Sequence, residues 1–206
     1  MPTVFSSAAA EFVVERSRFA AKTFYLPHPD ELQTCLDAMK SCYPHADHYP
    51  WAYRITASQQ RGFDDGEPHQ TAGLPMLLPL IHQDWTQTAV IAARYFGGTK
   101  LGRGGLTRAY QSACLQALAA TVQARTAELH HVTLSIAYPD YHRVAPWLSR
   151  ASTEWNEDFG DHITLRFCVE RRAWPNLQAR LDATCPWHLV DCRTELGRIP
   201  LGAPDA

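Results

Sequence analysis

The sequence lacks any apolar run near the length needed to cross a bilayer, and it shows no secretory leader. Its six cysteines are scattered, and none of them forms a Cys-x-x-Cys pair. Such scattered cysteines are typical of reduced thiols in the cytosol. We therefore expect a cytoplasmic protein without a membrane partner.

Several catalytic and cofactor signatures are also missing. The chain has no P-loop, no Gly-x-Ser-x-Gly elbow and no His-Glu-x-x-His helix. The segment from Gly102 to Thr107 begins like a dinucleotide fingerprint, but it lacks the third glycine, and positions 122–125 supply no acid for a ribose. Cys42, His45 and His48 are regularly spaced, yet no fourth zinc ligand follows at a suitable distance. We predict no cofactor and no metal.

An excess of charge of one sign is absent as well. The 19 Lys and Arg residues nearly balance 21 Asp and Glu residues, which leaves a formal net charge of −2. A nucleic-acid-binding surface would therefore have to be local. With 206 residues, of which 46% are hydrophobic, the chain should form one large or two small globular domains.

The most distinctive stretch runs from Arg94 to Tyr110. It contains five of the eleven glycines and four basic residues, but no carboxylate. An apolar run of strand length, 88–94, precedes it, and apolar residues at helical spacing follow from Leu106. The order is thus strand, glycine loop, helix.

Such a loop is suited to bind an anion. Glycines allow left-handed backbone and close approach of a ligand, while loop amides and a helix start attract negative charge. A tight structural turn with solvated basic side chains is the alternative. The candidate binding residues are Arg94, Gly97, Gly98, Lys100, Gly102, Arg103, Gly104, Gly105 and Arg108. We expect Gly98 and Gly104 to tolerate no side chain.

A second loop is acidic and contains Asp64, Asp65, Gly66 and Glu67. Its carboxylates could bind a cation or act as acid and base. They could instead form an Asp-Gly turn before a helix over Pro75–His82, which is the favoured interpretation. A third possibility is that the acidic and basic loops pair with each other.

The pattern changes near residue 130. Alternating strands and short helical segments from His131 onward give the order β-α-β-β-α-β, which is typical of a ferredoxin-like module. We therefore expect an α+β protein with one domain over 1–130 and a second over 131–206.

Four motifs together resemble the IMPACT/YigZ family of translation-associated proteins. They are Arg16-Ser-Arg-Phe19, Trp51-Ala-Tyr-Arg-Ile55, Asp64-Asp-Gly-Glu-Pro68 with Thr71-Ala-Gly73, and the glycine stretch from Arg94 to Tyr110. The resemblance implies an N-terminal α/β sandwich of the ribosomal-protein and GHMP-kinase type. It also implies a C-terminal domain like one in elongation factor G. Eukaryotic members are linked to control of translation initiation.

Three functions compete at this point. The first is a binding or regulatory protein that contacts RNA or a ribosome-associated factor, with phosphates on the basic loop and bases on aromatic faces. Those faces would come from Trp51, Tyr53, Tyr95 and Phe96. The second is an enzyme for a small phosphorylated or carboxylated ligand, held by Gly97–Gly105, with Asp65 or Glu67 as acid, base or cation ligand. The third is a regulator that binds only protein.

Overall fold

The computed structural model describes residues 1–201. The chain divides into two compact units, and the division falls between Arg125 and Thr126 in the sequence. Each unit combines helices with an antiparallel sheet, so the protein belongs to the α+β class. In the described part of the chain, no helix is long and apolar enough to cross a membrane.

The first unit is built on a five-stranded sheet in which every neighbouring pair is antiparallel. The central strand is β6, and its residues 88–94 are all buried because helices cover both faces of the sheet. This explains why the strand is a continuous apolar run rather than an alternating one. In spatial order the strands are β2 (Ala9–Val14), β3 (Ser17–Tyr25), β6 (Thr88–Tyr95), β4 (Trp51–Arg54) and β5 (Gln60–Phe63).

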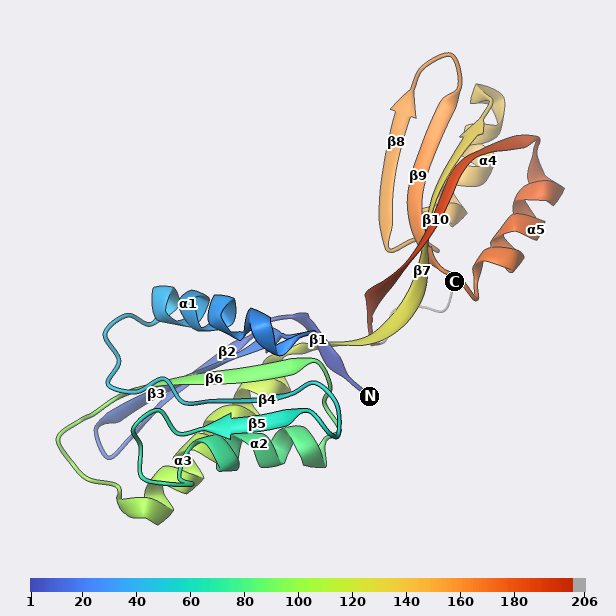
Figure 1. Cartoon of the computed structure of the whole chain (residues 1–206). Helices are drawn as coiled ribbons and strands as arrows, with labels where there is room; N and C mark the ends of the chain where they lie inside the picture. Colours follow the sequence, from blue (N-terminus) through green and yellow to red (C-terminus); the bar gives the residue numbers. More distant parts are fainter. Residues whose placement is uncertain (202–206) are drawn as a thin grey trace. The chain divides into compact units, whose positions relative to one another are not determined.

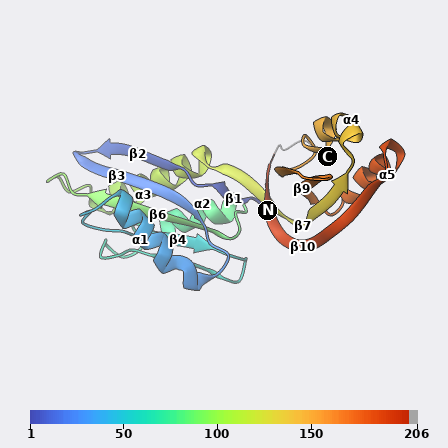
Figure 2. The ribbon, with the colours of Figure 1, turned by 90° about the horizontal axis from the view of Figure 1, so that it is seen from above.

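Helix α1 lies on one face of this sheet and helices α2 and α3 lie on the other, as Figures 1 and 2 show. Alternate residues of β6 therefore enter different cores: Ala89 and Ile91 pack with α1, and Val90 and Ala92 pack with α2 and α3. The helices are α1 (Leu32–Cys42), preceded by the 3₁₀ turn η1 (Pro29–Glu31), α2 (Gly73–His82) and α3 (Gly102–Ala120).

The second unit contains one sheet and two helices in the order β-α-β-β-α-β. Both helices pack on the same face of the sheet, where Leu134, Val144, Leu165 and Leu181 form part of one core. Strand β7 lies between β9 and β10, and β8 pairs with the outer side of β9. The elements are β7 (Val122–Ile136), α4 (Tyr138–Leu148), β8 (Glu154–Phe159), β9 (Ile163–Glu170), α5 (Trp174–Thr184) and β10 (Trp187–Pro200).

Strand β7 begins nine residues before His131, where the sequence pattern places its start. Its first residues pair with the short strand β1 (Thr3–Ser6), which supplies a partner that the local sequence does not reveal. The polar composition of 122–130 hides this strand from a periodicity search. The last five residues of the expected second domain, 202–206, lie outside the described residues.

Candidate anion-binding site

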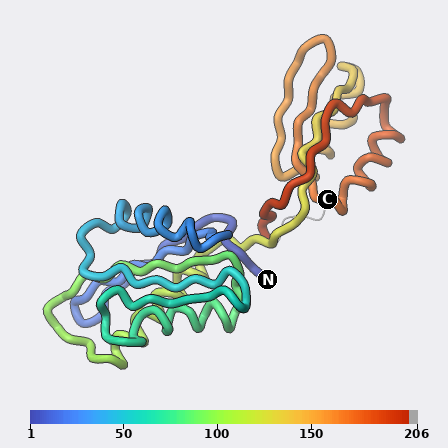
Figure 3. Tube along the Cα trace, in the orientation of Figure 1, coloured from blue at the N-terminus to red at the C-terminus, as the bar shows by residue number. Residues whose placement is uncertain are grey.

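Helix α3 begins at Gly102, four residues before the first apolar residue of its helical pattern. Gly102, Gly104 and Gly105 therefore belong to the first turns of the helix rather than to a free loop. The loop proper runs from Phe96 to Leu101, and Figure 3 shows it leaving β6 and turning back into α3. Gly98 has φ +86° and Gly102 has φ +67°, a left-handed conformation that side chains disfavour.

Gly104 differs from the expectation that it tolerates no side chain. A Cβ built at Gly104 would meet only the Arg108 guanidinium, at 3.8 Å, and its φ is not left-handed. Among the predicted glycines, Gly97 makes the closest approach to backbone: a Cβ there would lie 2.0 Å from the carbonyl of Arg16. Sequence alone could not separate them, because the obstructing backbone is about eighty residues away along the chain.

The basic and acidic loops line one pocket of about 520 Å³ at the start of α3. Arg94 near the end of strand β6, Phe96 just after that strand, and Gly66 and Glu67 of the acidic loop all line it. The lining residues are Asp47, His48, Gly66, Glu67, Pro68, Arg94, Phe96, Lys100, Leu101, Gly102, Arg103 and Leu106.

Arg94 is a buried structural residue, in contrast to its predicted role as an anion ligand. Its Nη1 donates to both carboxylate oxygens of Glu67, at 2.8 and 3.0 Å, and the Tyr110 hydroxyl donates to Glu67 at 2.6 Å. The Arg94 and Glu67 side chains are only 7% and 2% exposed. Burial, together with the negative charge of Glu67, raises the pKa of Tyr110, which keeps its hydroxyl as a donor. The Arg94 charge is thus neutralised within the fold.

The other two acidic residues also have structural partners. Asp64 accepts the backbone N–H groups of Gln70, Ala72 and Gly73, at 2.8 to 3.0 Å, and so fixes the start of α2. Asp65 accepts the Tyr49 backbone N–H at 2.7 Å. All three carboxylates are therefore engaged inside the protein, and the loop is the structural Asp-Gly turn that the sequence favoured.

These contacts give Asp64 a pH-dependent contribution to stability. Burial by itself raises the Asp64 pKa, but the three N–H donors outweigh it and hold the pKa below its ordinary value of 3.8. A carboxyl group whose pKa is depressed by folding stabilises the fold above that ordinary value. This contribution is lost as the pH falls through the depressed pKa. Stability of the first unit should therefore fall below pH ~4 in part because Asp64 is protonated.

Asp64→Asn is expected to cost about 1–2 kcal/mol at pH 7, since charged acceptors make the stronger hydrogen bonds. The loss should shrink as the pH falls toward ~3, where the wild type also loses the charge. Urea unfolding of both proteins across this range measures the difference. A loss that stays constant with pH would contradict this role of Asp64.

Three predicted basic residues remain available around the start of α3. Lys100, Arg103 and Arg108 are exposed. Arg103 donates to the carbonyl oxygen of His69 at 2.7 Å, which leaves its charge uncompensated. Within residues 1–201, Lys100 and Arg108 have no hydrogen-bond or ion-pair partner. Glu67 thus joins the acidic loop to Arg94 and Tyr110, and the positive charge of Lys100 and Arg103 is left at the pocket rim.

Only one of the four predicted aromatic residues lines the pocket. Phe96 is 47% exposed there, with the Arg94 guanidinium carbon 5.5 Å from its ring centroid. Trp51, Tyr53 and Tyr95 instead pack on the α1 side of the sheet. Because strand residues alternate between faces, they cannot share a surface with Arg94. Their predicted grouping with the basic loop is therefore wrong.

Two lining residues were not predicted as part of this site. Asp47 accepts the Phe96 backbone N–H at 2.7 Å and so holds the aromatic ring in place. His48 lies 2.7 Å from the carbonyl oxygen of Asp65 through Nδ1, which must carry the proton. His48 stood out in the sequence only through its spacing with Cys42 and His45, which did not indicate a metal site, and Asp47 had no sequence signal. The described residues contain no cluster of His, Cys, Asp and Glu that could hold a metal ion.

The comparisons with known proteins agree with the motifs. The family model of the Impact N-terminal domain matches residues 15–118. An IMPACT family member encoded in a pol 5′ region of Thermus thermophilus is 33% identical over 175 residues, which cover 84% of this chain and 96% of that protein. The IMPACT family member YigZ of Escherichia coli is 30% identical over 173 residues, covering 82% and 85% of the two chains.

The fold also has a counterpart among solved structures. The crystal structure of a hypothetical protein aligns with 92% of this chain and 97% of its own, with a TM-score of 0.59 and 23% identity. The family match includes both loops of the pocket and the helix that follows them. The chain belongs to the IMPACT family.

Proposed function

We propose that the protein is a regulatory factor of translation that binds unpaired RNA at the start of α3. The observation that carries this proposal is the unequal neutralisation of charge in the pocket. The two carboxylates that line it, those of Asp47 and Glu67, accept hydrogen bonds from the fold, whereas Lys100 and Arg103 at its rim, and Arg108 farther along α3, have no carboxylate partner among the described residues. The IMPACT family resemblance supports a role in translation, because its eukaryotic members are linked to control of initiation.

Unpaired RNA suits the shape of this site better than a duplex does. A volume of about 520 Å³ lies in the range of small-ligand pockets and suits one nucleotide. Phe96 offers an exposed ring on which a base can stack, and stacking needs a base that is free of a helix. The helix start and the adjacent cations would hold the phosphate.

The finer fold assignments also support a role in translation. We propose that the second unit is a ferredoxin-like module, because its strands lie in the order β10-β7-β9-β8 with both helices on one face. The first unit, with a central antiparallel sheet between α1 and the α2–α3 pair, is proposed to be the α/β sandwich of the ribosomal-protein type.

Catalysis is the weaker alternative for the same pocket. Glu67 is buried between Arg94 and Tyr110, and Asp65 is occupied by the Tyr49 N–H. A general acid or base needs an oxygen that can exchange a proton directly with the substrate, and neither carboxylate is free to do so. The arrangement therefore favours binding over acid–base chemistry.

Replacing Lys100 and Arg103 together by alanine tests the proposal. Each lost phosphate contact removes about 0.7 from the slope of log affinity against log salt for a single strand. The double variant should therefore bind an unpaired RNA octamer more weakly at low salt, with a slope smaller by about 1–1.5. Its melting temperature should change little, because exposed side chains rarely contribute more than about 0.5 kcal/mol.

The matched control removes the same charge from the second unit, as Arg150→Ala with Arg193→Ala. Both arginines are exposed. Fluorescence anisotropy with a labelled octamer across a salt series measures all three proteins. Equal salt-dependence slopes for the wild type and Lys100→Ala/Arg103→Ala would refute the proposed site. A smaller slope in the control variant alone would place RNA binding in the second unit instead. No binding by any of them would leave a protein partner as the better proposal.

A further inference from the structure

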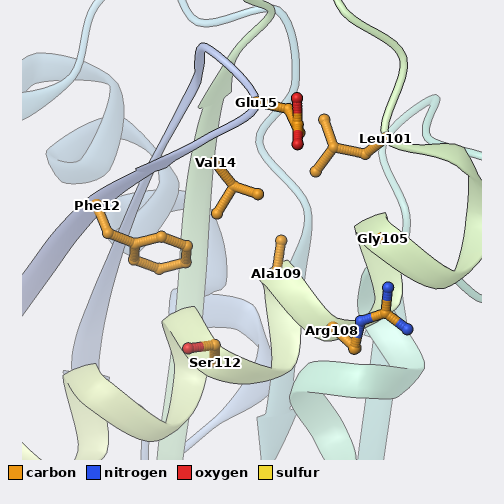
Figure 4. A pocket seen from close by; sticks show the side chains of 8 residues that line it. All are labelled: Phe12, Val14, Glu15, Leu101, Gly105, Arg108, Ala109 and Ser112. Carbon is orange, nitrogen blue, oxygen red and sulfur yellow. The ribbon is translucent and has the colours of Figure 1, made fainter.

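A second pocket, of about 440 Å³, lies on the other side of the start of α3 (Figure 4). The β2–β3 hairpin forms one wall, and the first three turns of α3 form the other. Its lining is apolar at the base, with one acidic and one basic side chain. The residues are Phe12, Val14, Glu15, Leu101, Gly105, Arg108, Ala109 and Ser112.

The two pockets adjoin each other at Leu101, which lines both. Gly105 leaves room next to Leu101 at this boundary, because a Cβ at Gly105 would lie 2.9 Å from the Leu101 Cβ. The cations are distributed on both sides: Lys100 and Arg103 line the first pocket, and Arg108 lines the second. A ligand with two flat groups joined by a negatively charged link would suit this arrangement, with one flat group in each pocket.

The turn that carries Glu15 is strained. Val14 pairs with Ser17 across a two-residue turn, and Glu15 and Arg16 both have positive φ, 45° and 65°. This type I′ geometry favours Asn-Gly, and neither residue present suits it. Strained backbone that is kept at a cavity points to a functional role for the side chain it presents.

Glu15 is the free acid of the second pocket. Its side chain is exposed and, among residues 1–201, has no hydrogen-bond or ion-pair partner. Figure 4 shows it beside Leu101, at the end of the pocket away from Ser112. A carboxylate there repels phosphate but accepts N–H groups of a ligand.

We propose that the second pocket holds the base of the next nucleotide of the strand, and that Glu15 selects a base with an amino group over uracil. This inference rests on the proposed RNA-binding function. We place the connecting phosphate beside Gly105 and Arg108, away from the Glu15 carboxylate (Figure 4). Cytosine offers its N4 amino group to a carboxylate, whereas uracil flanks its single N–H with two carbonyl oxygens that repel it.

The test compares tetracytidylate with tetrauridylate, two pyrimidine single strands of equal length and charge, and Glu15→Gln serves as the control for their different stacking. Wild type should bind tetracytidylate at least about fivefold more tightly, the lower limit for one good base contact. Glu15→Gln keeps the size of the side chain and can pair with either base, so the ratio should fall to near one. A wild-type ratio of one, or a ratio unchanged in Glu15→Gln, overturns the proposal.

A second variant tests the pocket itself. Ser112→Phe places a ring in the second pocket from its rim without changing charge. Cytidine 5′-monophosphate, which needs only the first pocket, should bind as in wild type, while the gain from a second nucleotide should be lost. If the dinucleotide CpC keeps its advantage in a variant with wild-type circular dichroism, the second pocket is not the base site.

The turn gives an independent third readout. Glu15→Asn with Arg16→Gly introduces the residues that the turn geometry favours, so the melting temperature should rise while the preference for cytosine disappears. A variant that is less stable, or that keeps the preference, contradicts the proposal. If tetranucleotides bind through Lys100 and Arg103 without any base preference, only this inference fails. If no RNA binds, the proposed function fails with it.

Discussion

Glu67→Leu is expected to destabilise the first unit by about 3–5 kcal/mol, because it leaves the Arg94 charge buried without its partner. Arg94 and Glu67 are both almost fully buried, and Tyr110 would lose its acceptor at the same time. Small domains are stable by about 5–15 kcal/mol, so much of the margin would be lost. Hydrogen exchange of the β6 amides under native conditions reports this opening free energy for the first unit alone.

Two further variants separate the buried charge from a simple packing defect. Tyr110→Phe removes one hydrogen bond to the carboxylate and should cost less, about 1.5–3 kcal/mol. Glu67→Leu combined with Arg94→Leu removes both charges and should recover much of the loss, since apolar residues can replace a buried pair at little cost. If the double variant is no more stable than Glu67→Leu alone, the buried charge does not explain the effect.

Gly97→Ala is expected to have the second-largest effect, about 3 kcal/mol, at the upper end for overpacking. Its Cβ would lie 2.0 Å from the carbonyl of Arg16 and 2.5 Å from the nitrogen of Ser17. Both are backbone atoms of the hairpin turn, so they cannot rotate away. Hydrogen exchange of β3 and β6 amides in the variant measures the loss.

Gly104→Ala is the matched control, because it adds the same methyl group to another glycine of the motif, in the first turn of helix α3. Its Cβ has space, and alanine is the better helix former by up to about 1 kcal/mol. The variant should therefore be as stable as wild type or slightly more stable. Equal behaviour of Gly97→Ala and Gly104→Ala would show that the close approach to the hairpin does not control the loop.

The local elements near the site could be predicted from the sequence because their signals are local. The apolar run over 88–94 is strand β6, and the spacing from Leu106 onward is helix α3. The Asp-Gly turn before α2 follows from residues within ten positions. The match to the Impact N-terminal domain over residues 15–118 then shows that these elements belong to one domain.

The pairing of side chains across the fold could not be predicted in the same way. Arg94 and Glu67 are 27 residues apart, and nothing local distinguishes a buried arginine from an exposed one such as Arg103. The aromatic residues failed for a related reason: the face on which Trp51 lies depends on the register of β4 against β6. The second pocket was missed because it needs the β2–β3 hairpin to lie against α3.

The most direct test of the central claim is a nuclear magnetic resonance titration of the ¹⁵N-labelled chain with an unpaired RNA octamer. If the start of α3 is the RNA site, the amides of Phe96, Gly98, Gly102, Gly104 and Gly105 should shift together and saturate. The amides of the second unit should move little. Shifts confined to the second unit or to the Trp51 face, with these glycine amides unmoved, would contradict the account.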